Sequence, residues 1–148
     1  MRILRALALL LLCPPALPIS APEPVPAPCC PLRHWVASWY GPGFEGRPMA
    51  STLTFWSWLP VVAHKTLPLG TLLRISRGGR SVLCIVLDRG PYITGRDVDL
   101  SRGVAAHLGL LRCGVGEVTV EITGEVPRAG WLDALDSLPL PAPLPVGV

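Results

Sequence analysis

One stretch of the sequence decides the fold: Val82-Leu83-Cys84-Ile85-Val86-Leu87-Asp88-Arg89-Gly90-Pro91. Six apolar residues in succession predict a β-strand that is buried on both faces, because a half-exposed strand would alternate polar and apolar residues. Gly90-Pro91 ends the strand, since proline has no N–H to donate and glycine tolerates a positive φ. Asp88 therefore stands where a buried strand meets a loop. Desolvation can raise the pKa of a carboxyl in such a place and make it a proton donor. The alternative is an aspartate that only hydrogen-bonds its own turn.

The two ends of the 148-residue chain differ in composition from its middle. Residues 1–21 have a basic start and a short apolar run, which predicts a secretory signal segment and an exported protein. Ser20-Ala21 suits ordinary cleavage, whereas Leu10-Leu11-Leu12-Cys13 resembles a lipoprotein box that would attach a lipid, and hence the membrane, at Cys13. Residues 22–32 predict a Pro-rich tether. Residues 127–148 predict a second disordered, Pro-rich flank, in which a short helix could form around Trp131. The globular domain is expected over residues 33–126.

Charge and cysteine content exclude several classes of protein. The formal net charge of +3 falls to +1 when two arginines leave with the signal segment, which is too little for a nucleic-acid-binding face. An exported chain can hold disulfides, and Cys84 and Cys113 both lie in the expected domain, so we predict that they are near each other. Cys29-Cys30 with His34 lacks the spacing of a zinc site, and no metal or other cofactor is expected.

Short strands separated by turn signals make up the expected domain. Besides the central stretch, strands are predicted over residues 35–40, 61–64, 71–76, 97–100 and 117–123. Gly78-Gly79 predicts a tight hairpin, and Ser101 is a suitable N-cap for one short helix that stops at Gly109. These elements indicate a mainly β barrel. The sequence has no phosphate-loop, serine-hydrolase or zinc-protease motif.

An uncharged aromatic segment precedes the second predicted strand. Phe55, Trp56 and Trp58 lie within it. Such rings can form part of a core or lid, or they can be exposed and stack against sugar rings. The sequence leaves both interpretations open.

Several motifs in a fixed order resemble one known family. They are Ala37-Ser38-Trp39-Tyr40-Gly41, Gly46-Arg47-Pro48-Met49-Ala50-Ser51, Ala63-His64-Lys65-Thr66-Leu67-Pro68-Leu69-Gly70-Thr71, Asp88-Arg89-Gly90-Pro91-Tyr92 and Asp97-Val98-Asp99-Leu100-Ser101. Together, over about residues 35–123, they are similar to the rare lipoprotein A (RlpA) family of the bacterial cell envelope. The resemblance implies a six-stranded double-psi β-barrel located in the periplasm or cell envelope. It also implies lytic transglycosylase activity on peptidoglycan.

The chemistry that the resemblance implies suits a single carboxyl group. A lytic transglycosylase cuts between N-acetylmuramic acid (MurNAc) and N-acetylglucosamine (GlcNAc) without water. One acid protonates the leaving oxygen and then, as a base, takes the proton of the muramic 6-hydroxyl, which closes a 1,6-anhydro ring. A second carboxylate is not obligatory, unlike in ordinary glycosidases. Asp88 is therefore the expected acid/base. His64 matches a residue of the family's site, where it would bond substrate or orient Asp88, unless the backbone of its own turn satisfies it.

Four further residues are expected to bind substrate. They are Tyr40, Glu45, Arg89 and Tyr92. A cation beside Asp88 would lower the pKa of an acid that ought to be raised, so Arg89 is expected to point away, toward Asp97 or Asp99.

One position departs from the family's pattern. The family's usual Glu, which follows Thr-Ala-Ser/Asn-Gly, falls at Leu53. Glu45 could take its place, or it could be a solvated loop charge. Two functional hypotheses therefore stand: a transglycosylase that acts on glycan strands, and a peptidoglycan-binding barrel that no longer cuts.

Overall fold

The computed structural model describes residues 31–41 and 43–139. Their strands are β1 (Arg33–Trp39), β2 (Val61–His64), β3 (Thr71–Arg77), β4 (Arg80–Asp88), β5 (Val98–Leu100) and β6 (Val115–Glu125), and their helices are α1 (Arg102–His107), the 3-10 helix η1 (Arg128–Gly130) and α2 (Trp131–Ser137). None of these helices is long and apolar enough to cross a membrane. The predicted signal segment with Cys13, most of the tether and the end of the Pro-rich tail lie outside the described residues.

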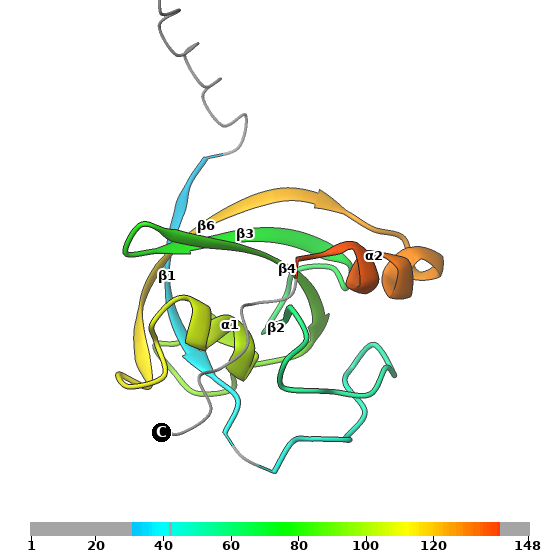
Figure 1. Ribbon diagram of the computed structural model, residues 1–148, viewed down its shortest axis with the longest axis horizontal. Coiled ribbons are helices and arrows are strands. Elements are labelled where there is room, and N and C mark those ends of the chain that lie inside the picture. Colours follow the sequence, from blue (N-terminus) through cyan, green and yellow to red (C-terminus); the bar gives the residue numbers. More distant parts are fainter. Residues whose placement is uncertain (1–30, 42, 140–148) are drawn as a thin grey trace, which may run out of the picture.

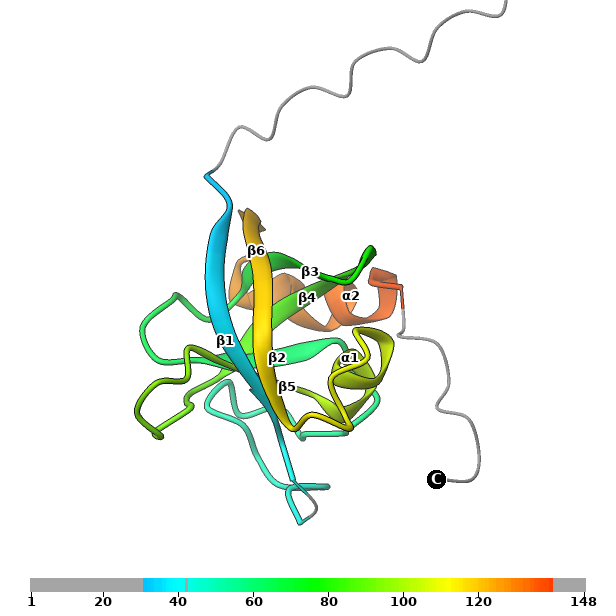
Figure 2. The ribbon, with the colours of Figure 1, turned by 90° about the vertical axis from the view of Figure 1, so that its left-hand side faces the viewer.

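The six strands close into a barrel in the order β1-β5-β2-β4-β3-β6, as Figures 1 and 2 show. Two of the pairings are parallel, β1 with β5 and β2 with β4, and they join segments that are far apart in the sequence. The remaining pairings are antiparallel and include the predicted hairpin of β3 and β4. The expectation of a mainly β, six-stranded barrel is therefore confirmed.

β4 is buried on both faces, as its apolar run predicts. Alternate residues of a strand point to opposite sides. Val82, Cys84 and Val86 belong to the barrel interior, whereas Ile85 and Leu87 belong to a second cluster outside it. We call this second group the outer cluster: Met49, Phe55, Val61, Ile85, Leu87, Trp131 and Leu135. Because a further layer of the protein covers the outer face of β4, the strand needs no polar side.

Helix α2 provides much of that covering layer. The indole Nε1 of Trp131 donates a hydrogen bond to the carbonyl oxygen of Val126 at 2.9 Å, and the N–H of Val126 donates to the carbonyl of Gly70 at 2.9 Å. Gly70 has a φ of +98°, and a Cβ there would collide with the Val126 carbonyl and lie 2.6 Å from Trp131 Nε1. Only glycine allows α2 to approach this turn so closely. The helix that the sequence allowed around Trp131 thus forms and packs against the barrel.

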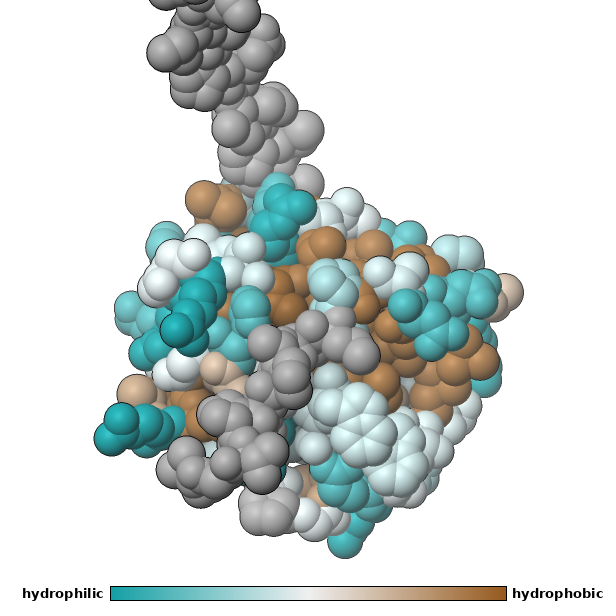
Figure 3. All heavy atoms as spheres, viewed as in Figure 1, coloured by the Kyte–Doolittle hydropathy of each residue, from teal (hydrophilic) through white to brown (hydrophobic). Residues whose placement is uncertain are grey.

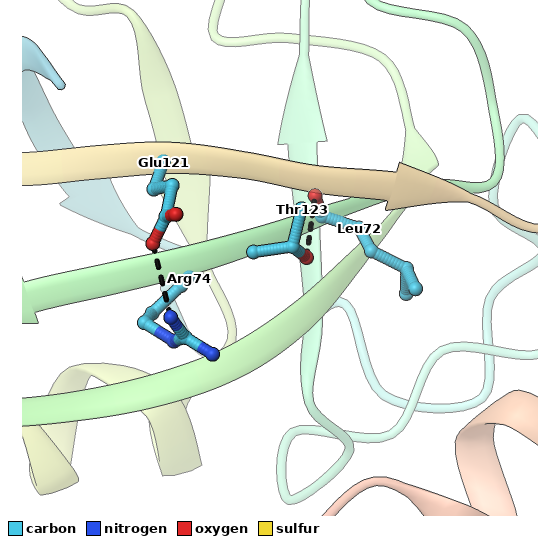
Figure 4. Close-up of polar contacts among 4 residues, drawn as sticks. All are labelled: Leu72, Arg74, Glu121 and Thr123. Carbon is cyan, nitrogen blue, oxygen red and sulfur yellow. Dashed lines mark hydrogen bonds and ion pairs between the residues drawn. The ribbon is translucent and has the colours of Figure 1, made fainter. Parts of the chain in front are cut away.

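The pairing of β3 with β6 also carries side-chain contacts, shown in Figure 4. Arg74 and Glu121 are paired residues, and their side chains form an ion pair at 3.0 Å. Beside the register shift at residues 72 and 73, the hydroxyl of Thr123 donates to the carbonyl of Leu72 at 3.3 Å. Because the Arg74 side chain is 49% exposed, the ion pair contributes little to stability, and the register depends mainly on the backbone ladder.

Two local predictions are confirmed and one is wrong. Gly78 and Gly79 both have a positive φ, as a tight hairpin requires. Ser101 caps α1, accepting a hydrogen bond from the N–H of Val104 at 3.4 Å. Cys84 and Cys113, however, are both free thiols. Cys84 points into the barrel interior, where burial raises the pKa of its thiol, and Cys113 is exposed on a loop, so the suggested disulfide between them does not form.

Candidate active site

Asp88 lies at the end of β4, where its half-buried carboxylate accepts three hydrogen bonds. Oδ1 accepts from the backbone N–H of Arg89 at 2.9 Å and of Ala50 at 2.8 Å. Oδ2 accepts from the hydroxyl of Tyr40 at 3.0 Å. The bond from Arg89 is the turn interaction that Asp often makes, but the other two donors come from segments distant in sequence. Asp88 is therefore more than a turn residue, because three separate segments meet at its carboxylate.

Tyr40 follows β1 and reaches Asp88 across the end of the barrel. Its ring packs against Phe55, with ring centroids 4.7 Å apart, and against Phe44 at 5.5 Å. Burial raises the pKa of the Tyr40 hydroxyl, and the neighbouring Asp88 carboxylate raises it further. The hydroxyl therefore stays protonated at physiological pH and remains a hydrogen-bond donor to Asp88. The sequence suggested a substrate-binding role for Tyr40, whereas its observed contact is with the carboxylate itself.

A tight turn over residues 49–53 presents the N–H of Ala50 to Asp88. The N–H of Thr52 donates to the carbonyl of Met49 at 2.9 Å, and the N–H of Met49 donates to the carbonyl of Leu53 at 2.9 Å. Ser51 ties the turn to β4, since its N–H donates to the carbonyl of Leu87 at 3.0 Å. Thr52 has a φ of +73°, a left-handed conformation that a β-branched residue rarely adopts. A glycine would take this conformation without strain.

His64 caps its own turn. Its Nδ1 accepts hydrogen bonds from the N–H groups of Thr66 at 3.2 Å and Leu67 at 3.0 Å, and its ring packs on Trp35 with centroids 4.7 Å apart. These bonds indicate a neutral imidazole with its proton on Nε2. Burial lowers the pKa of His64, and the Asp97 carboxylate only partly opposes this effect.

His64 and Asp88 are close in the sheet but are not hydrogen-bonded to each other among the described residues. Ala63 is the residue that pairs with Asp88 in the parallel β2–β4 ladder, and His64 follows it on β2. Successive side chains of a strand point to opposite faces of the sheet, so the side chains of His64 and Ala63 lie on opposite faces. Two backbone N–H groups of its own turn thus bond Nδ1 of His64, whereas a contact of Nε2 with substrate stays a prediction.

Arg89 points away from the Asp88 carboxylate, as expected, but toward different partners. Its guanidinium donates to the carbonyl oxygens of Leu67 at 2.8 Å and His64 at 3.2 Å. The expectation that it would reach Asp97 or Asp99 is wrong, because both carboxylates bind β1. Asp97 accepts from the N–H of Val36 at 2.8 Å, and Asp99 accepts from the hydroxyl of Ser38.

A cleft of about 420 Å³ adjoins the carboxylate site through Tyr40. Its lining comprises Trp39, Tyr40, Gly41, Gly43, Glu45, Ser57 and Arg102. Glu45 holds the loop at one side of the cleft, since both of its carboxylate oxygens accept from the N–H of Ser57, at 3.1 and 3.2 Å. The sequence did not single out Arg102. The only signal was its position immediately after the helix N-cap, which says nothing about what the side chain faces.

Among the described residues, the remaining candidates make no hydrogen bond to Asp88. Tyr92 is 85% exposed on the loop that follows β4. Leu53 packs against the outer cluster and lines a second hollow with Leu59, Leu132 and Leu135. Phe55 is buried, as a core residue would be, whereas Trp56 and Trp58 are 40% and 55% exposed. The aromatic segment thus serves as core at one residue and as surface at two.

Within residues 31–41 and 43–139, no group of three or more His, Cys, Asp or Glu side chains is placed to hold a metal ion. What the site offers is a hydrogen-bonded carboxylate beside an open cleft.

A closed six-stranded barrel in which two parallel pairings join segments distant in sequence is a double-psi β-barrel domain. The chain belongs to the lytic transglycolase family, whose model matches residues 34–120.

Its relatives include the probable endolytic peptidoglycan transglycosylase RlpA of Synechocystis sp., which is 43% identical over 93 residues, covering 62% of this chain and 29% of the relative. The endolytic peptidoglycan transglycosylase RlpA of Campylobacter jejuni is 38% identical over 91 residues, covering 60% of this chain and 33% of the relative. The chain thus spans about a third of the length of these relatives. Among solved structures, the Streptomyces papain inhibitor superposes with a TM-score of 0.50 at 21% identity, covering 64% of this chain and 97% of that one, which shows the shared fold.

Proposed function

We propose that this protein is an exported lytic transglycosylase that cleaves the MurNAc–GlcNAc bonds of peptidoglycan glycan strands. The observation that carries the proposal is the meeting of Tyr40, Ala50 and Arg89 at the Asp88 carboxylate, beside a cleft open to solvent. The family membership and the printed activity of the relatives support it. Export is supported by the signal-like residues 1–21, and a lipid on Cys13 would add an anchor in the cell envelope.

In this proposal Asp88 acts twice. As an acid it donates its proton to the glycosidic oxygen of the leaving sugar. It then accepts the proton of the muramic 6-hydroxyl while that oxygen attacks the anomeric carbon, which gives the 1,6-anhydro product. Tyr40 donates to Oδ2 and stabilises the negative charge that Asp88 carries between the two transfers. Substrate supplies the nucleophile, so no second protein carboxylate is required.

Three observations favour the alternative of a barrel that binds peptidoglycan without cutting it. Leu53, at the position of the family's Glu, packs against the outer cluster and offers no carboxylate. His64 is engaged with the backbone of residues 66 and 67 and does not contact Asp88. Glu45 is likewise held by Ser57, which leaves it as a loop anchor.

Digestion of purified sacculi distinguishes the two functions. We expect wild type to release anhydro-muropeptides, detected by mass spectrometry, and Asp88→Asn to bind sacculi but release none. The amide fills the same space and keeps an acceptor for Ala50, while general acid–base catalysis is worth about 10²- to 10⁴-fold. Asp133→Asn makes the same chemical change on exposed α2 and should cleave like wild type. Equal cleavage by well-folded Asp88→Asn would remove Asp88 from the mechanism, and sacculus binding without anhydro product from wild type would establish the alternative.

Leu53→Glu is the companion variant. If the missing family carboxylate limits turnover, this substitution raises the rate of anhydro-product release. Its side chain must then leave the apolar contacts with Leu59 and Leu135, so we also expect a lower melting temperature. An unchanged rate from a folded variant would show that Leu53 is not what limits the activity.

A further inference from the structure

Trp56 and Trp58 form an exposed aromatic surface beside the cleft. Their ring centroids are 5.0 Å apart and their planes differ by 19°, so the two indoles stack on each other. They nevertheless remain 40% and 55% exposed, which leaves apolar ring surface in water. Exposed indoles on a loop that is otherwise well anchored indicate a binding role more than a packing role.

The loop that carries these rings is held rigidly at its central residue. The N–H of Ser57 donates to the Glu45 carboxylate, and the carbonyl of Ser57 accepts from the N–H of Gly103 at 2.8 Å. The N–H of Leu59 donates to the carbonyl of Trp56 at 3.1 Å, which closes the turn. The stacked rings are thus already ordered, and a ligand would lose little free energy in fixing them.

The position of the rings relates them to the cleft. Ser57 lies between the two tryptophans in sequence and lines the cleft together with Tyr40, Glu45 and Arg102. A cleft of about 420 Å³ is a small-ligand volume, whereas a glycan strand is a polymer whose further rings must lie on the surrounding surface. The loop that carries the tryptophan pair borders the cleft at Ser57.

The chemistry of the surroundings favours sugar over an apolar partner. Sugar rings present C–H faces that pack on aromatic rings and hydroxyls that need polar partners. Glu45 and Arg102 offer such polar groups at the cleft side of the loop. Aliphatic residues gather over α2, which is the brown area in Figure 3. There Leu132 is 62% exposed, and it lines a second hollow together with Leu135 and Trp56. Trp56 thus borders this aliphatic area, whereas Trp58 is not among the residues that line the hollow, so a leucine variant on α2 is needed to separate stacking on sugar from apolar docking.

We propose that Trp56 and Trp58 form a stacking subsite for the sugar rings of a glycan strand whose scissile bond lies at Asp88. The subsite binds rings beyond those held in the cleft and contributes affinity without taking part in proton transfer. This inference rests on the proposed function for the identity of the glycan.

The test measures binding in an Asp88→Asn background, so that turnover does not consume the ligand. Soluble GlcNAc hexamer is titrated by isothermal calorimetry, and sacculi are used in a pull-down assay. We expect Trp58→Leu and Trp56→Leu each to weaken binding about tenfold, the loss typical of truncating a well-placed aromatic anchor. Trp58→Phe should retain most of the affinity because it keeps a flat ring. Leu132→Ala, which removes exposed apolar surface from α2, should bind like the parent.

Two results would overturn the subsite. The first is that both leucine variants bind the hexamer and the sacculi as tightly as the parent does. The other is a loss in Leu132→Ala as large as in the tryptophan variants, which would indicate a general apolar docking face. The outcome is separable from the proposed function: a wild type that yields no anhydro product can still show the ring-dependent binding. A wild type that cleaves while its tryptophan variants bind normally refutes the subsite alone.

Discussion

Replacing Tyr40 with phenylalanine tests the arrangement around Asp88 by removing one atom. The ring packs on Phe44 and Phe55, and phenylalanine keeps those contacts. What is lost is the hydroxyl that donates to Asp88 Oδ2 at 3.0 Å. The donors from Ala50 and Arg89 to Oδ1 remain. The variant therefore isolates a single charge-assisted hydrogen bond without disturbing the position of the carboxylate.

The magnitude follows from the nature of this bond. A hydrogen bond to a charged group is worth about 1.5–3 kcal/mol. Asp88 is only half-buried, so water can partly replace the hydroxyl in the resting protein, and we expect unfolding to become easier by no more than about 1 kcal/mol. In the transition state, substrate excludes that water and Asp88 alternates between acid and base. The lost bond should then cost about 10- to 100-fold in kcat, at 1.36 kcal/mol for each factor of ten.

The assay compares initial rates of anhydro-muropeptide release from sacculi with binding of the same sacculi. We expect Tyr40→Phe to lower the rate and leave binding almost unchanged, because the hydroxyl faces Asp88 and stabilises its negative charge. Phe44→Leu, which perturbs the packing of the ring but keeps the hydroxyl, is the matched control and should lose far less activity. If Tyr40→Phe cleaves as fast as wild type, the bond to Asp88 has no part in catalysis. A loss in binding equal to the loss in rate would instead assign Tyr40 to substrate contact.

Two further predictions concern stability. Thr52→Gly should raise the free energy of unfolding by about 1 kcal/mol. A non-glycine residue in the left-handed region costs roughly 1–3 kcal/mol, which glycine avoids. The greater conformational freedom of glycine in the unfolded chain cancels part of this gain. Thermal melting measures this, and Thr54→Gly, next to the turn and paired with Pro48, is a control that should be destabilised. An unchanged or lower melting temperature for Thr52→Gly would show that its backbone is unstrained. For His64, burial lowers the pKa in the folded state, so the unfolded chain binds more protons as the pH falls. Wild type should therefore be fully stable above the ordinary histidine pKa of about 6.5 and lose stability as the pH falls through that value toward the lower folded pKa. His64→Asn keeps an acceptor for the N–H groups of Thr66 and Leu67 but cannot titrate, so its melting temperature should fall less over this range; parallel curves for the two proteins would contradict the assignment.

Local patterns in the sequence predicted the elements of the barrel. The apolar run of β4 indicated burial on both faces, and Gly90-Pro91 placed Asp88 at a strand end. The pair of glycines predicted the hairpin, and Ser101 predicted the start of α1. These features depend on backbone conformation and on side-chain periodicity, which neighbouring residues determine among themselves.

The partners of each side chain could not be predicted in this way. The two carboxylate oxygens of Asp88 accept hydrogen bonds from Tyr40 and Ala50, which lie 48 and 38 residues away in the sequence. Only the closed strand order of the barrel brings these segments together. The pattern likewise could not tell that Arg89 would bind carbonyl oxygens while Asp97 bound β1.

The error over the cysteines has the same origin. Both residues belong to the domain, but Cys84 lies on the inward face of β4 and Cys113 on an exposed loop. A run of apolar residues predicts that a strand is buried, but it does not predict on which of the two buried faces a given side chain lies. The sequence by itself therefore determined the strands, the turns and the place of Asp88 at a strand end. The tertiary structure alone decided what surrounds that carboxylate, because the barrel's parallel pairings and the packing of α2 are long-range contacts that no local periodicity encodes.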